Sequence, residues 1–335
     1  MINFRQDVSL LPFNTFGIPA IASVFVESDN EIELSDFLRS LPDPSAPFLL
    51  GGGSNVLFVS DRYPMIVRPL IKGIQLIDES ADSVLVRAGA GEIWDDFVCW
   101  CVSRNYAGVE NLSHIPGTVG ACPLQNIGAY GTEAKDTIEA VETVEIATGS
   151  KMIFTNGQCQ FEYRNSTFKK NKGKYLITAV QFRLSKIFEP NVKYADLNEI
   201  LSRNARITIL DLRQAIIDIR SRKLPDPEKL GNAGSFFKNP VINQAQSKKI
   251  SQLDAQAPLY PVSQESWKIS AAWLIQHCGW KGVQDGNVGT HKQQPLVIVN
   301  YGGATGKEIL NFAQKIIDSV DNYFNIRLEP EVNII

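Results

Sequence analysis

A long glycine-rich segment limits the choice of fold more than any other part of this sequence. Residues 106–131, YAGVENLSHIPGTVGACPLQNIGAYG, follow neither a helical nor a strand repeat of apolar positions. Loops of this length in compact domains are usually functional or disordered, and this one carries too many apolar residues for disorder. Its glycines and amides would suit a strip of backbone laid along a dinucleotide, although spacing alone leaves a structural loop equally open. These residues are Gly117, Gly120, Gly128, Gly131, Gln125 and Asn126.

Short apolar runs and helical patterns alternate on both sides of this segment. The predicted strands are 23–28, 65–70, 73–80, 83–90, 140–149, 151–156, 175–185 and 295–301. The helical patterns are 31–41, 93–105, 208–224, which Pro225 closes, and 305–324. Strands dominate the first half and helices the second, so the sequence predicts an α+β protein.

Length and charge narrow the class of partner. The 335 residues are enough for two or three domains, and 44% hydrophobic residues can fill their cores. The formal net charge is −3, with basic and acidic residues mixed along the chain. This mixture gives no electrostatic footprint for a nucleic acid or an anionic membrane. A small molecule is therefore the expected partner, and the chain is expected to be a monomer.

The sequence also bears on location and on metal binding. The first twenty residues lack a basic region followed by an apolar core, and no apolar run is long enough to span a bilayer, so a cytoplasmic protein is expected. The cysteines are odd in number, without a Cys-x-x-Cys pair, and are expected to be reduced core residues. The histidines are scattered, so no metal site is predicted. They are Cys99, Cys101, Cys122, Cys159 and Cys278, and His114, His277 and His291.

Three shorter glycine runs differ from the standard phosphate-binding motifs. GGGSN at 51–55 could be a tight turn or an anion-binding nest, but Val56 stands where a Rossmann fingerprint needs glycine. GAGEIW at 89–94 has Trp94 at the third glycine position, which favours a structural turn. GGATGKE at 302–308 lacks the second glycine and the Ser or Thr of a P-loop, which excludes an NTPase.

Eight motifs together resemble the UDP-N-acetylenolpyruvoylglucosamine reductases, flavoenzymes that make UDP-N-acetylmuramate for bacterial cell walls. The matches run in order from near residue 14 to residue 332, so the resemblance covers nearly the whole chain. The motifs are NTFGI (14–18), GGGSNVLF (51–58), IPGTVGACPLQNIGAYG (115–131), YRNSTFK (163–169), RKLPDP (222–227), GNAGSFFKNP (231–240), HKQQPLVIVN (291–300) and LEPEV (328–332).

The resemblance implies a domain plan within the α+β class. An FAD-binding unit of the vanillyl-alcohol-oxidase (PCMH) type would cover residues 1–187, in two subdomains of about 1–70 and 71–187. A substrate-binding C-terminal domain would cover 208–324, and a terminal strand at 325–335 would carry a catalytic glutamate.

FAD is the implied cofactor and NADPH the implied reducing cosubstrate. Backbone donors of GGGSN and of the long loop would hold the FAD pyrophosphate and neighbouring groups, and Arg220 corresponds to a flavin-contacting arginine. The implied cofactor-binding residues are Gly51, Gly52, Gly53, Ser54, Asn55, Gly117, Thr118, Gly120, Ala121, Gln125, Gly128 and Arg220.

The resemblance names Ser235, Arg164 and Glu331 as catalytic residues. Hydride addition to the enolpyruvyl methylene carbon leaves an enolate, which a serine hydroxyl within hydrogen-bond reach can protonate. The permanent charge of Arg164 can stabilise that enolate, and Glu331 must be protonated to help as a donor. From the residues alone, a surface salt bridge for the arginine and an exposed charge for the glutamate are the alternatives.

Substrate contacts also follow from the resemblance. The implied residues are Tyr194, Lys223, Asn239 and Gln294, with Tyr130 and Tyr260 as weaker candidates. Lys223 suits a diphosphate because its ammonium is a point charge. The YADL segment resembles the first of two family subtypes, in which a tyrosine-bearing loop closes over the substrate and excludes water. Asn333 departs from the pattern, since an arginine is frequent there.

Two other functions are compatible with the sequence. One is a different FAD-dependent oxidase or dehydrogenase of the same fold, against which the SFFKNP, RKLPDP and LEPEV motifs argue because they belong to the substrate side. The other is a catalytically silent nucleotide-sugar or flavin-binding protein, against which the joint presence of Ser235, Arg164 and Glu331 argues.

Overall fold

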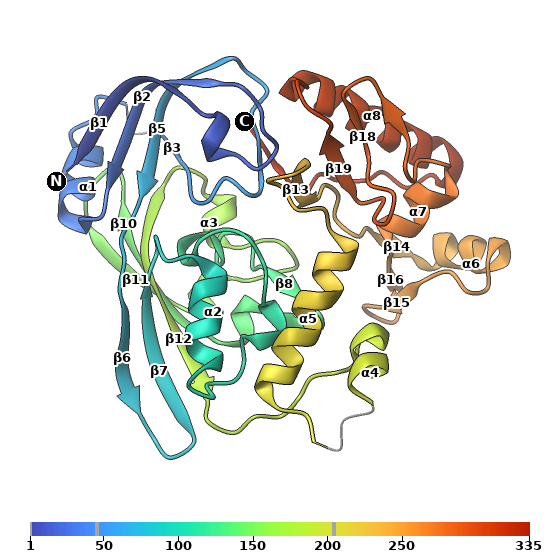
Figure 1. The fold of residues 1–335 in the computed structure, drawn as a ribbon, viewed down its shortest axis with the longest axis horizontal. Coiled ribbons are helices and arrows are strands. Elements are labelled where there is room, and N and C mark those ends of the chain that lie inside the picture. The colour runs from blue at the N-terminus through green and yellow to red at the C-terminus, as the bar shows by residue number, and fades with distance from the viewer. Residues whose placement is uncertain (1, 44–46, 203–205) are drawn as a thin grey trace. The chain divides into compact units, whose positions relative to one another are not determined.

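The computed structural model describes residues 2–43, 47–202 and 206–335. Residue contacts divide the chain into two compact units. The first unit contains the described residues up to Ser9, within Ile21–Gly53 and within Arg62–Arg222. The second contains Leu10–Ala20, Ser54–Asp61 and Lys223–Ile335. The second unit therefore combines two short N-terminal segments with the C-terminal third of the chain (Figure 1).

A four-stranded sheet opens the first unit. Its order is β1-β2-β5-β3, with β1 antiparallel to β2 and the other pairs parallel. The strands are β1 (Asn3–Ser9), β2 (Ile21–Ser28), β5 (Arg62–Pro69) and β3 (Pro47–Leu49). Helix α1 (Glu31–Arg39) begins where the Asn30 side chain accepts hydrogen bonds from the next turn, and it buries Leu34 and Leu38. Strand β1 was not predicted, because its sequence alternates too weakly in polarity.

A five-stranded antiparallel sheet forms the rest of the first unit's framework. Its order is β11-β10-β12-β7-β6. The strands are β6 (Ile74–Glu79), β7 (Ser83–Gly89), β10 (Ile138–Glu145), β11 (Lys151–Thr155) and β12 (Tyr175–Ser185). Helix α2 (Trp94–Val102) packs on it through Trp94 and Phe97, whose rings meet Phe182. The central strand β12 is buried from 176 to 180, as expected for a strand covered on both faces.

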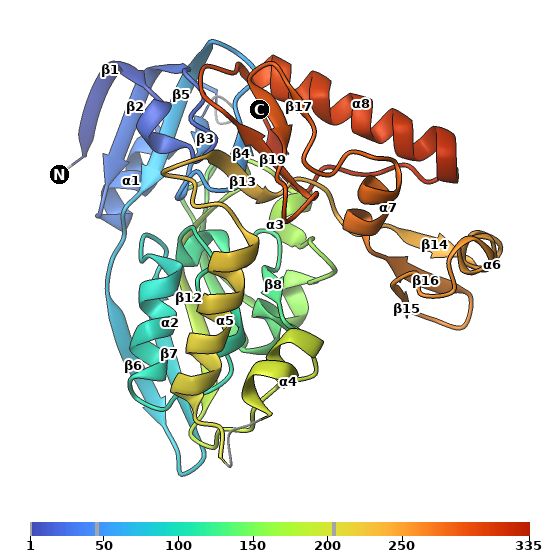
Figure 2. The same ribbon diagram turned by 45° about the vertical axis from the view of Figure 1, so that its right-hand side comes forward.

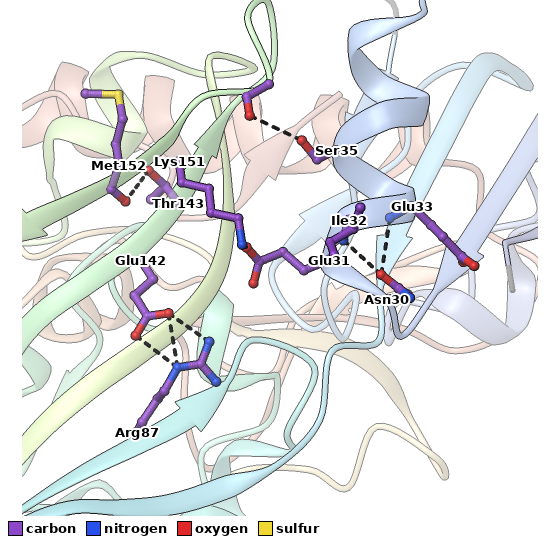
Figure 3. A network of polar contacts seen from close by, with 11 residues as sticks. Asn30, Glu31, Ile32, Glu33, Ser35, Arg87, Glu142, Thr143, Lys151 and Met152 are labelled. Carbon is purple, nitrogen blue, oxygen red and sulfur yellow. Dashed lines mark hydrogen bonds and ion pairs between the residues drawn. The ribbon is translucent and has the colours of Figure 1, made fainter.

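Polar contacts connect helix α1 to the β10–β11 hairpin (Figure 3). Glu31 pairs with Lys151 at 2.7 Å, and the Ser35 hydroxyl donates to the Gly149 carbonyl at 3.4 Å. Figure 3 also shows Arg87, whose Nε and Nη2 donate hydrogen bonds to the carboxylate of Glu142 at 2.7–3.0 Å. This second pair spans β7 and β10 and lies mostly out of solvent, with side-chain exposures of 22% and 18%.

We expect Glu142→Gln to lower the free energy of unfolding at pH 7 by about 1–3 kcal/mol, because it leaves Arg87 without its charge-assisted bonds. Burial alone would raise the pKa of Glu142, but the hydrogen bonds from Arg87 and Gln181 outweigh it and lower that pKa. The contribution is therefore complete above the ordinary glutamate pKa and is lost as the pH falls towards the lowered one. Chemical denaturation at a series of pH values measures it.

Glu139→Gln is the matched control, since Glu139 lies on the same strand and pairs with Arg183 at 3.1 Å with both side chains exposed. Its expected cost is under about 1 kcal/mol. Equal costs for the two variants, or a Glu142→Gln effect independent of pH, would contradict the argument.

The glycine-rich segment 106–131 follows α2 and precedes β10 in the sequence, and it contains only short elements. These are the 3-10 turns Glu110–Leu112 and Val119–Ala121, then β8 (Gly128–Ala129) and β9 (Thr132–Glu133). After it come α3 (Thr167–Lys170), α4 (Ala195–Leu201) and α5 (Ile209–Lys223). Helix α5 buries Leu212, Ile216 and Ile219 against α4, and it lies beside α2 in both ribbon views (Figures 1 and 2).

A second four-stranded sheet, β13-β19-β18-β17, forms the framework of the second unit. Its strands are β13 (Gly231–Ser235), β19 (Val297–Asn300), β18 (Val288–Thr290) and β17 (Gln284–Asp285). Helix α8 (Gly306–Phe324) buries one face, beginning at a capping box between Thr305 and Glu308. This cap explains the GGATGKE run, whose threonine and glutamate start a helix. Helix α7 (Ala271–His277) accompanies α8.

A smaller sheet completes the second unit. It has the order β14-β16-β15, with helix α6 (Gln244–Leu253) beside it. The strands are β14 (Val241–Asn243), β16 (Ser266–Ile269) and β15 (Leu259–Pro261). A further pair joins β4 (Val56–Leu57) to β20 (Asn333–Ile334) in parallel. In the described part of the chain, no helix combines the length and apolar character that crossing a bilayer needs.

The contact-based units differ from the expected domain plan in two places. Helix α5 belongs to the first unit, because its apolar face packs on α4 and its Arg213 pairs with Asp95 of α2. Residues 10–20 and 54–61 belong to the second unit. There Phe16 meets Phe236 edge to face with ring centroids 6.2 Å apart, and β4 pairs with β20. Such contacts join positions hundreds of residues apart, and no local sequence pattern reports them.

Candidate active site

Two glycine-rich segments meet in the first unit. A Cβ atom added at Gly52 would lie 2.9 Å from the Cα of Gly117, and one at Gly51 would lie 3.0 Å from the Thr118 hydroxyl. A Cβ at Gly120 would lie 2.6 Å from the Cβ of Ala90. Backbones therefore approach so closely here that only glycine fits. The structure brings together two loops that the sequence separates by more than 60 positions.

A cavity of roughly 100 Å³ lies beside this contact. Both loops contribute to its wall, together with apolar residues of β3, β5 and β12 and the ring of Tyr175. The lining residues are Leu49, Leu50, Gly51, Pro69, Ala90, Thr118, Gly120, Ala121, Leu124, Tyr175, Leu176 and Ile177. A narrow, largely apolar wall bordered by backbone amides suits one edge of an extended dinucleotide.

The two loops differ in the donors they offer. The amides of 119–122 are used internally: Val119 and Gly120 donate to the carbonyls of Glu92 and Ala90 at 2.8 and 2.9 Å. Among the described residues, none accepts a hydrogen bond from the amides of Gly51–Gly53. Gly53 has a φ of 67°, so a left-handed residue ends this run. Three consecutive free N–H groups form a nest for an anion, which fits a pyrophosphate.

Two predicted tyrosines and one arginine come together elsewhere in the first unit. The ring of Tyr130 meets Tyr194 edge to face, with centroids 5.6 Å apart. Burial raises the pKa of Tyr130, and the nearby charge of Arg220 opposes that rise. Tyr194 itself is 51% exposed and directly precedes helix α4, so the YADL segment is largely helical. The pair thus combines a half-buried and an exposed tyrosine ring.

Arg164 occupies a strained backbone position. Its φ of 56° lies in the left-handed region, which costs an ordinary residue about 1–2 kcal/mol. Its Nη2 donates to the carbonyl of Gly128 at 2.8 Å, and a Cβ at Gly128 would lie only 3.0 Å from Nη1. The guanidinium also lies over the ring of Tyr163 at 5.3 Å. Glycine at 128 thus lets the guanidinium reach the backbone of the long loop.

Gln125 and Asn126 differ in their surroundings within that loop. Gln125 is partly exposed, whereas Asn126 is fully buried. The Asn126 amide donates to Glu133 and to the Glu162 carbonyl at 3.0 and 3.2 Å, and it accepts from the Lys135 N–H at 3.0 Å. Asn126 therefore holds the loop's own structure.

Ser235 ends strand β13 in the second unit. Gly234 before it has a φ of 69°, and its N–H donates to the Asn232 side chain at 2.9 Å. The Phe236 N–H after it donates to the Leu296 carbonyl at 2.8 Å. The serine is half-buried, and no described residue forms a hydrogen bond with its hydroxyl. Without a basic partner the hydroxyl is not activated as a nucleophile, but it is available to donate a proton.

Glu331 lies next to this serine through main-chain bonds. Its N–H donates to the carbonyl of Phe236 at 2.7 Å, and Pro330 forms a bridge with Phe237. On the other side the Asn55 side chain donates to the Glu331 carbonyl at 3.4 Å. The backbone around the glutamate is thus fixed by the same segment that carries the serine.

Asn333 has a clear structural place. Its side chain donates to the Asn55 carbonyl at 3.0 Å, and its N–H donates to the same oxygen at 3.1 Å. Both bonds hold β20 on β4. The position where an arginine is frequent in the family therefore serves strand pairing in this chain.

The remaining predicted residues of the second unit are more dispersed. Asn239 accepts from the N–H of Ala271 at 2.9 Å, at the start of α7. Gln294 precedes the turn that brings Leu296 to β13, and its carbonyl accepts from the Val297 N–H at 3.0 Å. Tyr260, 57% exposed, lies on the small sheet, and the exposed Lys223 ends α5. Ser54 is half-buried at the start of its short segment.

The thiols take no visible part in these arrangements. All five are free: Cys99 is exposed, Cys278 is partly buried, and the others are buried. Burial raises the pKa of Cys159 to about 12 and raises that of Cys122 well above its usual range. Such thiols are inert packing residues. Across the described ranges, no three His, Cys, Asp or Glu side chains lie close enough together to hold a metal ion.

Sequence reasoning missed three residues beside the cofactor segment. Asp95 accepts two hydrogen bonds from Arg213 and one from the His114 N–H, while the His114 carbonyl accepts from Arg220 at 3.0 Å. Asp95 and Arg213 lie 118 positions apart, and each looks like an ordinary charge on a surface helix. The contact could have been predicted only if the helices expected at 93–105 and 208–224 had been known to pack side by side.

Comparison with known proteins agrees with this geometry. Residues 22–154 match the family described as an FAD binding domain, and residues 226–335 match the C-terminal domain of UDP-N-acetylenolpyruvoylglucosamine reductase. A reductase of that name from Xylella fastidiosa (strain M12) is 44% identical over 99% of this chain and 95% of its own length. One from Flavobacterium johnsoniae is 42% identical over the whole of both chains.

A solved structure shares the fold. The crystal structure of UDP-N-acetylenolpyruvylglucosamine reductase from Thermus caldophilus matches 100% of this chain and 99% of its own, with a TM-score of 0.71 and 22% identity. The predicted α+β fold, an FAD-binding unit followed by a C-terminal domain, is confirmed. With full-length relatives above 40% identity, the chain belongs to the UDP-N-acetylenolpyruvoylglucosamine reductase family.

Proposed function

We propose that this chain reduces UDP-N-acetylglucosamine enolpyruvate to UDP-N-acetylmuramate, a precursor of peptidoglycan, with FAD as cofactor and NADPH as reductant. The observation that carries the proposal is the main-chain bond from Glu331 to Phe236, the residue directly after Ser235, within a domain that matches the reductase's C-terminal family. An FAD-binding match over residues 22–154 supports the cofactor. The alternatives, another flavin oxidase or a silent binding protein, have no such observation in their favour.

FAD fits the donors of the first unit. The free amides of Gly51–Gly53 would receive the pyrophosphate. The cofactor would lie against the cavity wall formed by Thr118, Gly120 and Ala121, where the glycines leave room. Arg220 would contact the flavin. When bound, reduced FAD supplies the hydride for the substrate's methylene carbon.

Ser235 would donate the proton. Hydride addition leaves a carbanion next to the substrate carboxylate, delocalised as an enolate. This base is strong enough to take a proton from a serine hydroxyl held within hydrogen-bond reach. The hydroxyl at the end of β13 suits that role, because no acceptor among the described residues competes for its proton.

Arg164 and Glu331 would stabilise the developing charge. The guanidinium of Arg164 is fixed in direction by the Gly128 carbonyl, and its permanent charge would stabilise an enolate or carboxylate oxygen. Glu331 would contact the same kind of oxygen through its carboxyl group. Both groups would act most strongly in the transition state, where that oxygen carries most charge.

Substrate binding would use a lysine ammonium, side-chain amides and tyrosine side chains. The ammonium of Lys223 would meet the diphosphate, and Asn239 and Gln294 would offer amide donors and acceptors. Tyr194 would cover the substrate, with Tyr130 and Tyr260 as further contacts. Since a nucleotide sugar and NADPH are both cytoplasmic metabolites, we place the enzyme in the cytoplasm as a monomer.

Anaerobic visible spectroscopy of the purified protein tests the proposal. We expect NADPH to bleach the flavin absorbance and UDP-N-acetylglucosamine enolpyruvate to restore it. Bleaching without restoration would keep a flavoenzyme and reject this substrate. A protein that takes up no FAD on reconstitution would leave only the silent-binder alternative.

A further inference from the structure

Asp95 and Arg213 form a two-point ion pair between helices α2 and α5. Arg213 Nη1 and Nη2 donate to Asp95 Oδ1 and Oδ2 at 2.8 and 2.9 Å. The side-chain exposures are 13% for the arginine and 28% for the aspartate. Fork geometry and partial burial distinguish this pair from the exposed surface pairs of the chain, which contribute little.

The same carboxylate also holds the backbone of the glycine-rich segment. Asp95 accepts a hydrogen bond from the N–H of His114, and the carbonyl of His114 accepts from Arg220 Nε at 3.0 Å. His114 has a φ of 60°, a left-handed conformation that a histidine rarely adopts. Side chains thus fix both main-chain polar groups of a residue with a strained backbone.

One helix supplies both arginines. Arg213 and Arg220 are seven residues apart on α5, about two turns, so they project from the same face. Residue 114 is followed directly by IPGTVGA, which contains the glycine contact and part of the cavity wall. Helix α2 meets that segment again where the Trp94 N–H donates to the Gly117 carbonyl at 3.1 Å.

We propose that Asp95 and Arg213 are positioning residues for the cofactor: by clamping His114 they set the course of residues 114–121 and the direction of Arg220. Neither residue lines the cavity, so they act through the backbone they hold. The inference rests on the proposed FAD-binding role of this segment. It predicts that breaking the pair weakens FAD binding more than it weakens folding.

The electrostatics agree with a clamp. Burial by itself would raise the pKa of Asp95, but the hydrogen bonds from Arg213 and from the His114 N–H outweigh it, and the pKa is lowered. The carboxylate is therefore charged at neutral pH, when it holds the peptide. Arg213 correspondingly keeps its charge, since its bond to Asp95 raises its pKa.

The test measures the dissociation constant of FAD, by flavin fluorescence, on protein freed of cofactor and reconstituted. We expect Asp95→Asn and Arg213→Gln each to weaken binding roughly 10- to 100-fold, the range of a charge-assisted hydrogen bond. The double variant should bind FAD no more weakly than the single variant with the lower affinity, because the two groups act as one unit. Arg213→Lys should recover part of the loss, since a point charge replaces the fork incompletely.

Asp96→Asn is the matched control, because Asp96 is the exposed neighbour in the same helical turn and its loss changes the helix charge equally. Its FAD dissociation constant should equal that of the unmodified protein. Thermal unfolding of the cofactor-free proteins separates positioning from stability. Unchanged affinity in Asp95→Asn and Arg213→Gln, an equal loss in Asp96→Asn, or additive losses in the double variant would each overturn the inference. If the unmodified protein binds no FAD, the proposed function fails before any variant is compared.

Discussion

Ser235→Ala is expected to slow reoxidation of the reduced flavin by the enolpyruvyl substrate by about two to four orders of magnitude, the usual contribution of a positioned proton donor. Reduction of the flavin by NADPH should stay close to normal, because that half-reaction needs no proton from the substrate side. The effect should be confined to the chemical step, since within the described part of the chain the serine hydroxyl makes no hydrogen bond whose loss would disturb the fold. Anaerobic stopped-flow absorbance measures the two half-reactions separately.

Ser251→Ala is the control for that experiment, since Ser251 is an exposed serine of helix α6 in the same unit. Both of its half-reactions should match those of the unmodified protein. Equal slowing of the two half-reactions in Ser235→Ala would reject the serine as the proton donor. It would indicate instead that the substitution disturbs the flavin itself.

Gly306→Ala should destabilise the second unit by about 3 kcal/mol or more, at the upper end of the costs of overpacking. A Cβ atom there would lie 1.7 Å from the carbonyl oxygen of Phe58 and 2.7 Å from its carbonyl carbon. These are backbone atoms, so no side-chain rotation can relieve the clash, and either α8 or the strand segment must move. Thermal unfolding followed by circular dichroism measures the loss.

Gly157→Ala is the control, because it makes the same replacement of glycine by alanine at another position. No atom lies within 4 Å of a Cβ added at Gly157, and its φ is not in the left-handed region. The expected effect is neutral or stabilising by up to about 1 kcal/mol, since the unfolded chain loses freedom. A Gly306→Ala protein as stable as Gly157→Ala would show that the helix start can shift at little cost.

Periodicity predicted four of the helices and the strands that form most of the first unit's two sheets, but few of the short strands of the second unit. The predicted helices are α1, α2, α5 and α8. The pattern at 305–324 corresponds to α8 from Gly306 to Phe324, and that at 208–224 to α5 from Ile209 to Lys223. The run VLFVS after the glycines forms only the two-residue strand β4. Its partner β20 comes from the other end of the sequence, so its length depends on a contact that no local window contains.

The candidate site could be predicted from the sequence only in part. The glycines of 51–53 and of 117–120 look alike in sequence, yet the first run keeps its amides free while the second uses them on Glu92 and Ala90. Sequence motifs identified Ser235 and Glu331, but not the bond through Phe236 that joins their segments. Such distinctions depend on which carbonyl a folded backbone presents, and residue types do not specify that.

The pairing of β4 with β20 also governs how the chain can fold. Residues 56–57 are synthesised well before their hydrogen-bonding partners 333–334, so the β4–β20 pair can form only after translation has reached residues 333–334. A fragment beginning at Lys223 would lack both Phe16 and β4. The second unit therefore cannot be expressed as one continuous fragment. Circular permutation or fragment complementation would have to keep its three segments, 10–20, 54–61 and 223–335, together for it to assemble.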